Sequence, residues 1–275
     1  MKKSIFFVNV YGCPDVSGDL DKMFLLMNEI GASGLQFHIT ELMSLDATKF
    51  KALLKENEAS VDCVHVTPRL LAEDDEIFAE AVKECETALE NISQFGCKRL
   101  MVVPFTPFDV KDKKTALERF AEGLRLVIEK AEKYGVSVVI ENISLLTLPF
   151  STLSDVEFLL DNVKGLKLCF DTGNFVCTKI DTIEAFEKFR SRIDMVHVKD
   201  FGICSEGGFE CDSGINVDHI AFGKGEAKLE EVLKLLYNNN PDVPYVVEVH
   251  NEKPPKDDVI QACRFSDKVW EECRK

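Results

Sequence analysis

Three carboxylic acids and one histidine stand at the ends of short apolar runs in the second half of the chain. Glu141 follows VSVVI, Asp171 follows LKLCF, His197 lies in DMVHVKD and Glu248 lies in PYVVEVHN. Carboxylate and imidazole ligands suit a divalent cation such as Mn²⁺, Mg²⁺ or Co²⁺, with Zn²⁺ as a further candidate. A structural zinc site is disfavoured because the set contains no thiolate. The four residues therefore predict one divalent-metal site.

Each of these residues also has an ordinary structural explanation. A single acid at a strand end usually caps a helix or pairs with a base, and a single strand histidine usually hydrogen-bonds in the core. Burying three acids and an imidazole together is costly, however, unless the groups are paired or bind a cation. The combination therefore favours metal ligands, and Lys199 could balance their surplus negative charge.

Eight apolar runs predict the strands that would position these side chains. The runs are rich in β-branched and aromatic residues, and longer stretches with helical spacing lie between them, for example over Asp75–Phe95 and Thr115–Tyr134. The predicted strands are Ile5–Val10, Leu35–Ile39, Ser60–Val66, Arg99–Pro104, Val136–Asn142, Leu166–Asp171, Asp194–Lys199 and Pro244–His250.

This alternation predicts a parallel sheet whose outer face is covered by helices. Eight strand–helix units in a row fit one closed (β/α)₈ TIM barrel, which we expect to form a single domain over residues 1–275. A doubly wound open sheet is the alternative, but no GxGxxG motif follows the first predicted strand. In a barrel, active-site residues lie at the carboxyl ends of the strands, where the four candidate ligands stand.

Composition narrows the function classes further. The 275 residues include 33 basic and 48 acidic side chains, so the formal net charge is −15. This balance disfavours nucleic acid and anionic membrane surfaces as partners, since both attract basic faces. The chain has ten cysteines but no CxxC pair, and its N-terminal apolar run is too short for a signal peptide. We therefore expect a reduced protein of the cytoplasm that has no membrane span.

The motifs VVIEN, LCFDTGN, HVKDFG and VVEVHN, in this order, resemble those of the xylose isomerase-like TIM barrel superfamily. The likeness is greatest to its sugar phosphate isomerase/epimerase branch and includes the segment FGKGEAKLEEVLKLL. The resemblance implies that Glu141, Asp171, His197 and Glu248 bind one metal ion and that Glu141 and Glu248 are the catalytic acid/base pair. It also makes His65 a substrate-binding candidate, although a structural hydrogen bond explains this residue equally well.

What the resemblance implies is an isomerase or epimerase of a small sugar, ketose or keto-polyol. Two glutamates would move a proton through a metal-stabilised enediolate. Lys199 and Asn174 would contact the sugar, and Asp200 would orient His197 from behind. Outer barrel helices of the family often form dimer or tetramer contacts, which makes a homo-oligomer compatible with the resemblance.

Two other reactions use the same scaffold. A lyase or dehydratase acting on an inosose or a dehydroshikimate-like acid needs the same carbanion chemistry, and the motifs do not exclude it. An endonuclease IV-like DNA-repair enzyme needs a histidine-rich zinc cluster and a basic surface. Five histidines and the negative net charge argue against the endonuclease.

Some features depart from the family pattern or lie outside it. Asn174 stands where many relatives have histidine, and an amide is a poorer metal ligand. The segment between His197 and Glu248 is long, which suggests either a lid or partner surface, or a solvated insertion. Phe7, Phe105 and Phe108 are candidates for an apolar wall of a sugar pocket.

Overall fold

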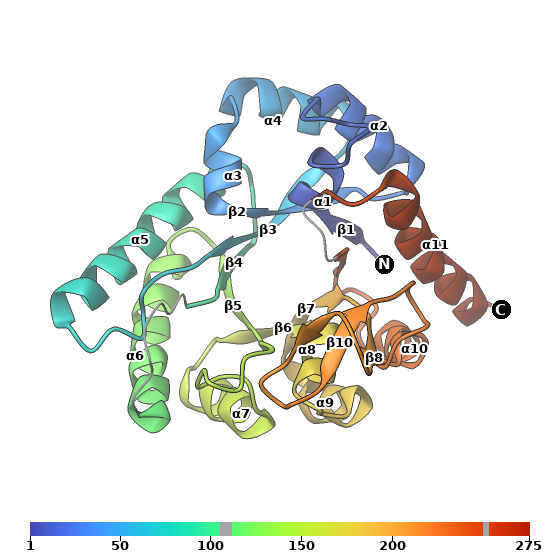
Figure 1. The fold of residues 1–275 in the computed structure, drawn as a ribbon. Coiled ribbons are helices and arrows are strands. Elements are labelled where there is room, and N and C mark those ends of the chain that lie inside the picture. Colours follow the sequence, from blue (N-terminus) through green and yellow to red (C-terminus); the bar gives the residue numbers. More distant parts are fainter. Residues whose placement is uncertain (105–111, 250–252) are drawn as a thin grey trace. The chain divides into compact units, whose positions relative to one another are not determined.

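The computed structural model describes residues 1–104, 112–249 and 253–275. Eight parallel strands form a closed barrel in the order β1-β11-β7-β6-β5-β4-β3-β2 (Figure 1). The predicted (β/α)₈ TIM barrel is therefore confirmed. The barrel strands are β1 (Lys3–Phe6), β2 (Gly34–His38), β3 (Ser60–Val66), β4 (Arg99–Val102), β5 (Ser137–Glu141), β6 (Lys167–Asp171), β7 (Ile193–Val198) and β11 (Tyr245–Val247).

Helices alternate with these strands along the chain. They are α1 (Phe7–Tyr11), α2 (Leu20–Glu29), α3 (Ile39–Ser44), α4 (Ala47–Glu56), α5 (Asp75–Ser93), α6 (Lys113–Glu132), α7 (Leu153–Asn162), α8 (Thr172–Cys177), α9 (Thr182–Phe189), the 3₁₀ turn η1 (Arg190–Arg192), α10 (Leu229–Asn239) and α11 (Lys256–Cys273). Within the part of the chain that the structure describes, none of them is both long and apolar enough to cross a membrane.

Local sequence explains where the two longest predicted helices begin. The carboxylate of Asp74 accepts hydrogen bonds from the backbone at the start of α5, and Asp112 does the same at the start of α6. Such caps satisfy N–H groups that have no partner inside the helix. Each helix then buries one apolar stripe, as the spacing of its apolar residues predicts.

The first predicted strand is shorter in the structure. The run Ile5–Val10 was expected to be one strand, but β1 ends at Phe6 and the chain enters the short helix α1. Phe7 and Val10 are buried in the structure, at 3% and 0% exposure, as they would also be in a buried strand. A short apolar run that is buried all round carries no periodicity that separates strand from helix.

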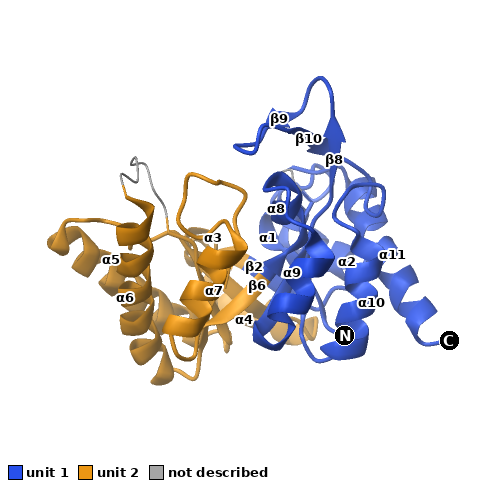
Figure 2. Ribbon diagram, turned by 90° about the horizontal axis from the view of Figure 1, so that it is seen from below, with its two compact units in different colours: residues 1–36, 170–275 blue, residues 37–169 orange. Residues whose placement is uncertain are grey.

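The chain divides into two compact units, coloured separately in Figure 2. Unit 1 comprises residues 1–36 and 170–275. In it β11 pairs with β1 and with β7, so that Val246 lies opposite both Ser4 and His197. The outer helices pack on these strands through aromatic side chains, for example Tyr245 against Trp270 at 5.3 Å between ring centroids.

Unit 2 comprises residues 37–169. Its strands β3, β4 and β5 pair in parallel, and β5 pairs with the first part of β6. Its core contains phenylalanine pairs that are packed edge to face or tilted, such as Phe37 with Phe50 at 5.6 Å and Phe120 with Phe150 at 5.2 Å. All four rings are fully buried.

The long segment between His197 and Glu248 is ordered and belongs to unit 1. Its first half forms a small antiparallel sheet of β8 (Phe201–Cys204), β10 (Asn216–His219) and β9 (Phe209–Glu210). The Ser213 hydroxyl donates to the Cys177 carbonyl at the end of α8, 2.5 Å away. The second half is α10 and the turn into β11. The sequence alone did not predict this extra sheet.

Candidate metal centre

Asp171 ends β6 and begins α8. Its Oδ1 accepts the backbone N–H of Asn174 at 2.7 Å, so the carboxylate caps the helix, while Oδ2 faces His197 and Lys199. The side chain is fully buried. Burial alone raises the pKa of Asp171, but the Lys199 ammonium and His197 outweigh it and hold the pKa well below the ordinary value. Asp171 is therefore a buried, ionised carboxylate.

His197 lies on β7 with 1% of its surface exposed. Its Nε2 is 2.9 Å from the Oε1 of Gln36 on β2, and the ring packs edge-on against Phe6 at 5.1 Å. An amide oxygen only accepts hydrogen bonds, so the Nε2–H of His197 is the donor. The other ring nitrogen, Nδ1, lies 3.6 Å from Asp171 Oδ2 and 3.4 Å from Glu248 Oε2.

Lys199 follows β7 and places a buried cation beside two of the candidate ligands. Its Nζ is 3.2 Å from Asp171 Oδ2 and 2.5 Å from Glu248 Oε1. The aliphatic stem crosses Gly173, where an added Cβ would lie 2.7 Å from the Lys199 Cγ. The Thr172 hydroxyl accepts the Lys199 N–H at 2.9 Å and donates to the Lys199 carbonyl at 2.7 Å. Backbone and side chain of Lys199 are thus both fixed by the turn after Asp171.

Glu248 follows β11, and its side chain is 18% exposed. The next residue, Val249, exchanges two hydrogen bonds with the side chain of Asn9. The Asn9 Nδ2 donates to the Val249 carbonyl at 2.8 Å, and the Val249 N–H donates to the Asn9 Oδ1 at 3.0 Å. Asn9 lies in α1 and is buried. This pair of bonds holds the backbone immediately after Glu248.

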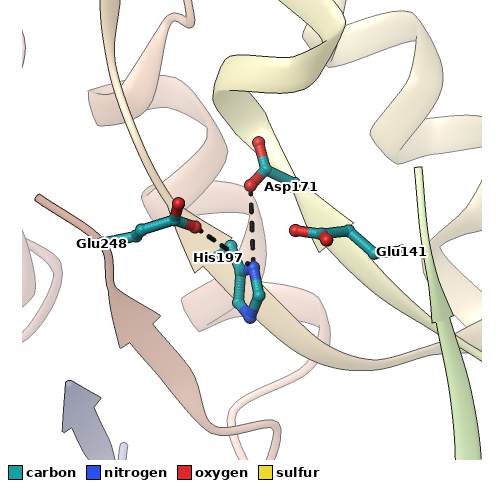
Figure 3. A group of neighbouring side chains, drawn as sticks. All are labelled: Glu141, Asp171, His197 and Glu248. Carbon is teal, nitrogen blue, oxygen red and sulfur yellow. Dashed lines mark ion pairs between the residues drawn. The ribbon is translucent and has the colours of Figure 1, made fainter. Parts of the chain in front are cut away.

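Figure 3 shows the side chains of Asp171, His197 and Glu248 pointing toward one another in unit 1. Each offers one ligand atom, and these atoms lie within 4.8 Å of one another. Figure 3 also draws Glu141, the fourth residue of the predicted ligand set. It comes from unit 2, where it ends β5 opposite Cys169 of β6, two residues before Asp171. Carboxylates and an imidazole nitrogen are suitable donors for a divalent cation.

Asp200 has a different role from the one expected. From the sequence, its carboxylate is expected to orient His197, but Gln36 is the hydrogen-bond partner of the His197 Nε2. The Asp200 carboxylate instead accepts three backbone N–H groups of the loop 222–228 before α10, which we call the glycine-containing loop. The donors are Gly223 at 2.8 Å, Gly225 at 3.0 Å and Ala227 at 3.3 Å. Burial raises the pKa of Asp200, and these N–H groups oppose the rise. Its function in the fold is to hold this loop.

The remaining predicted residues are distributed over both units. Asn174 is buried in α8 of unit 1, and its backbone N–H donates to the Asp171 carboxylate that caps this helix. His65 is half-buried on β3 of unit 2, and its ring packs edge to face against His38 at 4.9 Å. Phe7 packs against Tyr11 inside α1. Phe105, Phe108 and His250 lie outside the described residues.

Gln36 and Asn9 are the positioning residues that sequence reasoning missed. Gln36 is fully buried within the otherwise apolar run GLQF, and Asn9 is 2% exposed within FFVNVY. A polar side chain inside such a run needs a hydrogen-bond partner when it is buried. That signal was visible in the sequence, but the partners, His197 and Val249, lie more than 150 positions away.

Comparison with known proteins agrees with this description. The family model described as "Xylose isomerase-like TIM barrel" matches residues 24–269 of the chain. The IOLI protein with a bound zinc atom superimposes with a TM-score of 0.80 at 16% identity, covering 99% of both chains. The E. coli 3-keto-D-glucoside 4-epimerase YcjR superimposes with a TM-score of 0.76 at 17% identity, covering 98% of this chain and 99% of that chain. At such low identity these two structures show the fold alone.

A similar curated protein is named "Putative hydroxypyruvate isomerase" and comes from Caenorhabditis elegans. It is 28% identical over 95 residues, which is 33% of this chain. The match spans only 36% of that relative's own length.

Proposed function

Because the chain belongs to the xylose isomerase-like TIM barrel family, whose model matches residues 24–269, we propose that it is a divalent-metal-dependent isomerase or epimerase of a small sugar, ketose or keto-polyol. The observation that carries the proposal is the convergence of Asp171, His197 and Glu248, with a buried lysine beside them. One ammonium, that of Lys199, is shared by the two carboxylates, so it neutralises only part of their charge. A divalent cation held by the same side chains would neutralise the rest.

The proposed metal ligands are Glu141, Asp171, His197 and Glu248. Three carboxylates, one neutral imidazole and the Lys199 ammonium carry a formal charge of about −2, which a divalent cation would balance. When bound, Mn²⁺, Mg²⁺, Co²⁺ or Zn²⁺ would act as a Lewis acid toward the carbonyl and hydroxyl oxygens of a substrate and favour the enediolate.

The chain's own residues would supply proton transfer and orientation. We assign the acid/base pair to Glu141 and Glu248, which would remove a proton from the carbon beside the carbonyl and return one. General acid–base catalysis of this kind contributes about 10²–10⁴-fold. Asn9 holds the backbone at Glu248, and Gln36 holds the His197 ring with Nδ1 toward the carboxylates. Both would keep the reacting groups in place.

Three further residues are proposed to contact the sugar. Lys199 would donate to a substrate oxygen from its place between Asp171 and Glu248. Asn174 and His65 are the other candidates. Asp200 is not among them, because its carboxylate is occupied by the backbone of the glycine-containing loop.

The experiment is a substrate screen with product identification. Purified protein with added Mn²⁺ would be incubated with free ketoses, 3-keto sugars and inososes, and the products identified by NMR. An isomer or epimer of one of these compounds supports the proposal. A dehydrated product would assign the chain to the lyase alternative, which starts with the same proton abstraction. No product from any of them would contradict the proposed reaction.

A further inference from the structure

A cavity of about 300 Å³ opens beside Glu248 within unit 1. Its walls come from four places in the sequence: Asp200 between β7 and β8, the end of β10 with the residues that follow it, Glu248 and Val249 after β11, and the first turns of α11. The polar side chains that line it include those of Glu248, Asp200, His219, Asp258 and Gln261, and Phe222 is part of its apolar wall. A cavity of this size, partly apolar and with a few polar groups, is typical of a small-molecule site.

The charge of this cavity is one-sided. Three of the described side chains that line it are carboxylates, and none of the described ones is lysine or arginine. Burial lowers the pKa of His219, so its imidazole is neutral near pH 7 and offers one donor and one acceptor. The Gln261 amide likewise both donates and accepts. These are groups that recognise hydroxyls, and the carboxylates repel an anion.

The amino end of α11 strengthens this charge argument. An 18-residue helix whose first turn borders a cavity would ordinarily attract a phosphate, because its backbone N–H groups point outward there. In this chain Asp257 and Asp258 occupy that first turn. Asp258 lines the cavity and Asp257 does not. The positive end of the helix dipole is therefore already balanced by a carboxylate at the cavity wall.

The buried ammonium nearby is also committed. Lys199 Nζ lies between Asp171 and Glu248, at 3.2 and 2.5 Å from their carboxylate oxygens. A phosphate or carboxylate in the cavity would have to compete with these two acids for Lys199. The hydroxyl of an uncharged sugar can accept the third N–H of Lys199 without displacing either acid, because an ammonium has three donors.

We propose that this cavity receives the hydroxyl-bearing end of an uncharged sugar and that Asp258 excludes substrates whose corresponding end carries phosphate or carboxylate. The inference rests on the proposed function and narrows its substrate class. It separates a free ketose or keto-polyol from sugar phosphates and from short keto acids, all of which are compatible with enediolate chemistry.

The test compares binding of two matched probes, fructose and fructose 6-phosphate, measured by calorimetry on the whole protein. For the wild type we expect fructose to bind at least about tenfold more tightly than its phosphate ester, since juxtaposed like charges weaken binding strongly. Asp258→Lys should reduce this ratio by about tenfold or more. Asp257→Lys is the matched control, because it changes the same net charge and the same helix turn outside the cavity, and it should change the ratio less than about threefold.

Several outcomes would overturn the inference. They are tighter binding of the phosphate ester to the wild type, an unchanged ratio in Asp258→Lys, equal effects of the two variants, or no binding of either sugar. Circular dichroism of both variants checks that α11 still forms. If the ratios behave as expected but no sugar is converted, the proposed reaction fails while the charge selection stands. If sugars are converted but the ratios do not follow, the charge selection fails while the proposed reaction stands.

Discussion

Replacing Lys199 by methionine tests how the candidate metal ligands are held. Methionine keeps an unbranched stem that fits over Gly173, where a Cβ would be only 2.7 Å from the lysine Cγ, but it removes the ammonium. Asp171 and Glu248 would then face each other without a counter-ion. Asp171 is fully buried, and the Glu248 side chain is 18% exposed.

The magnitude follows from this burial. Removing one partner of a buried ion pair costs about 3–5 kcal/mol, and the partial exposure of Glu248 places the expected loss near the lower end. Without metal, we therefore expect Lys199→Met to lower the free energy of unfolding by about 3 kcal/mol. A divalent cation, in contrast, should bind the variant more tightly than the wild type. Two unit charges about 4 Å apart interact by about 4 kcal/mol at an effective dielectric of about 20, so relief of even a third of that repulsion tightens Mn²⁺ binding about tenfold.

The assay is urea unfolding in EDTA and in Mn²⁺, together with calorimetric titration of Mn²⁺. Bound metal stabilises the native state by mass action, so the variant should gain more stability from Mn²⁺ than the wild type does. Lys228→Met is the control, since Lys228 pairs with Asp181 at 2.5 Å on the surface and its loss should scarcely move the midpoint. A metal-free variant as stable as the wild type, or one that binds Mn²⁺ more weakly, would refute the reasoning.

Three further substitutions test the residues that hold the site. Gln36→Leu removes the acceptor for the His197 Nε2–H and should weaken Mn²⁺ binding, measured by calorimetry, about 10–100-fold. Gln36→Glu should restore the affinity, and equal affinities in all three proteins would contradict the assignment. Asn9→Ala removes two hydrogen bonds from the backbone after Glu248 and should lower the free energy of unfolding by about 1–3 kcal/mol. It should also reduce kcat more than it changes KM, and an effect on KM alone would argue against a positioning role. Asp200 has a raised pKa, so its contribution to stability is complete below its ordinary value of 3.8 and is lost as the pH rises through the raised value. The stability difference between the wild type and Asp200→Asn should therefore shrink as the pH rises above 3.8, and a difference that grows with rising pH would be inconsistent with it.

Most of the barrel was predictable because its strands are buried on both faces and its helices on one. Ser60–Val66 was predicted with the bounds of β3, and the bounds of β5, β6 and β7 differ from prediction by at most one residue. The first strand was predicted too long because Phe7–Tyr11 is apolar whether helical or extended. The small sheet of β8, β9 and β10 was missed because its strands are two to four residues long and largely exposed. Such strands carry little hydrophobic pattern.

The candidate site, too, was predictable only in part. Asp171, His197 and Glu248 were predictable together because strand ends of a parallel barrel meet on one side. Their supporting residues were not, because each contact joins positions far apart in the chain. Gln36 reaches His197, Asn9 reaches Val249, and neither spacing follows a helical or strand period. The role of Asp200 was misjudged because its position three residues after His197 does not show where its carboxylate points.

The most direct test of the central claim is solvent deuterium uptake by a free ketose in deuterated buffer, measured with and without Mn²⁺. Proton exchange by Glu141 and Glu248 predicts deuterium at the carbon next to the carbonyl, at a rate that depends on the protein and on the metal, and that falls by at least about 100-fold in Glu248→Gln. Turnover without deuterium uptake, or uptake that is equally fast after metal removal, would contradict the proposed mechanism.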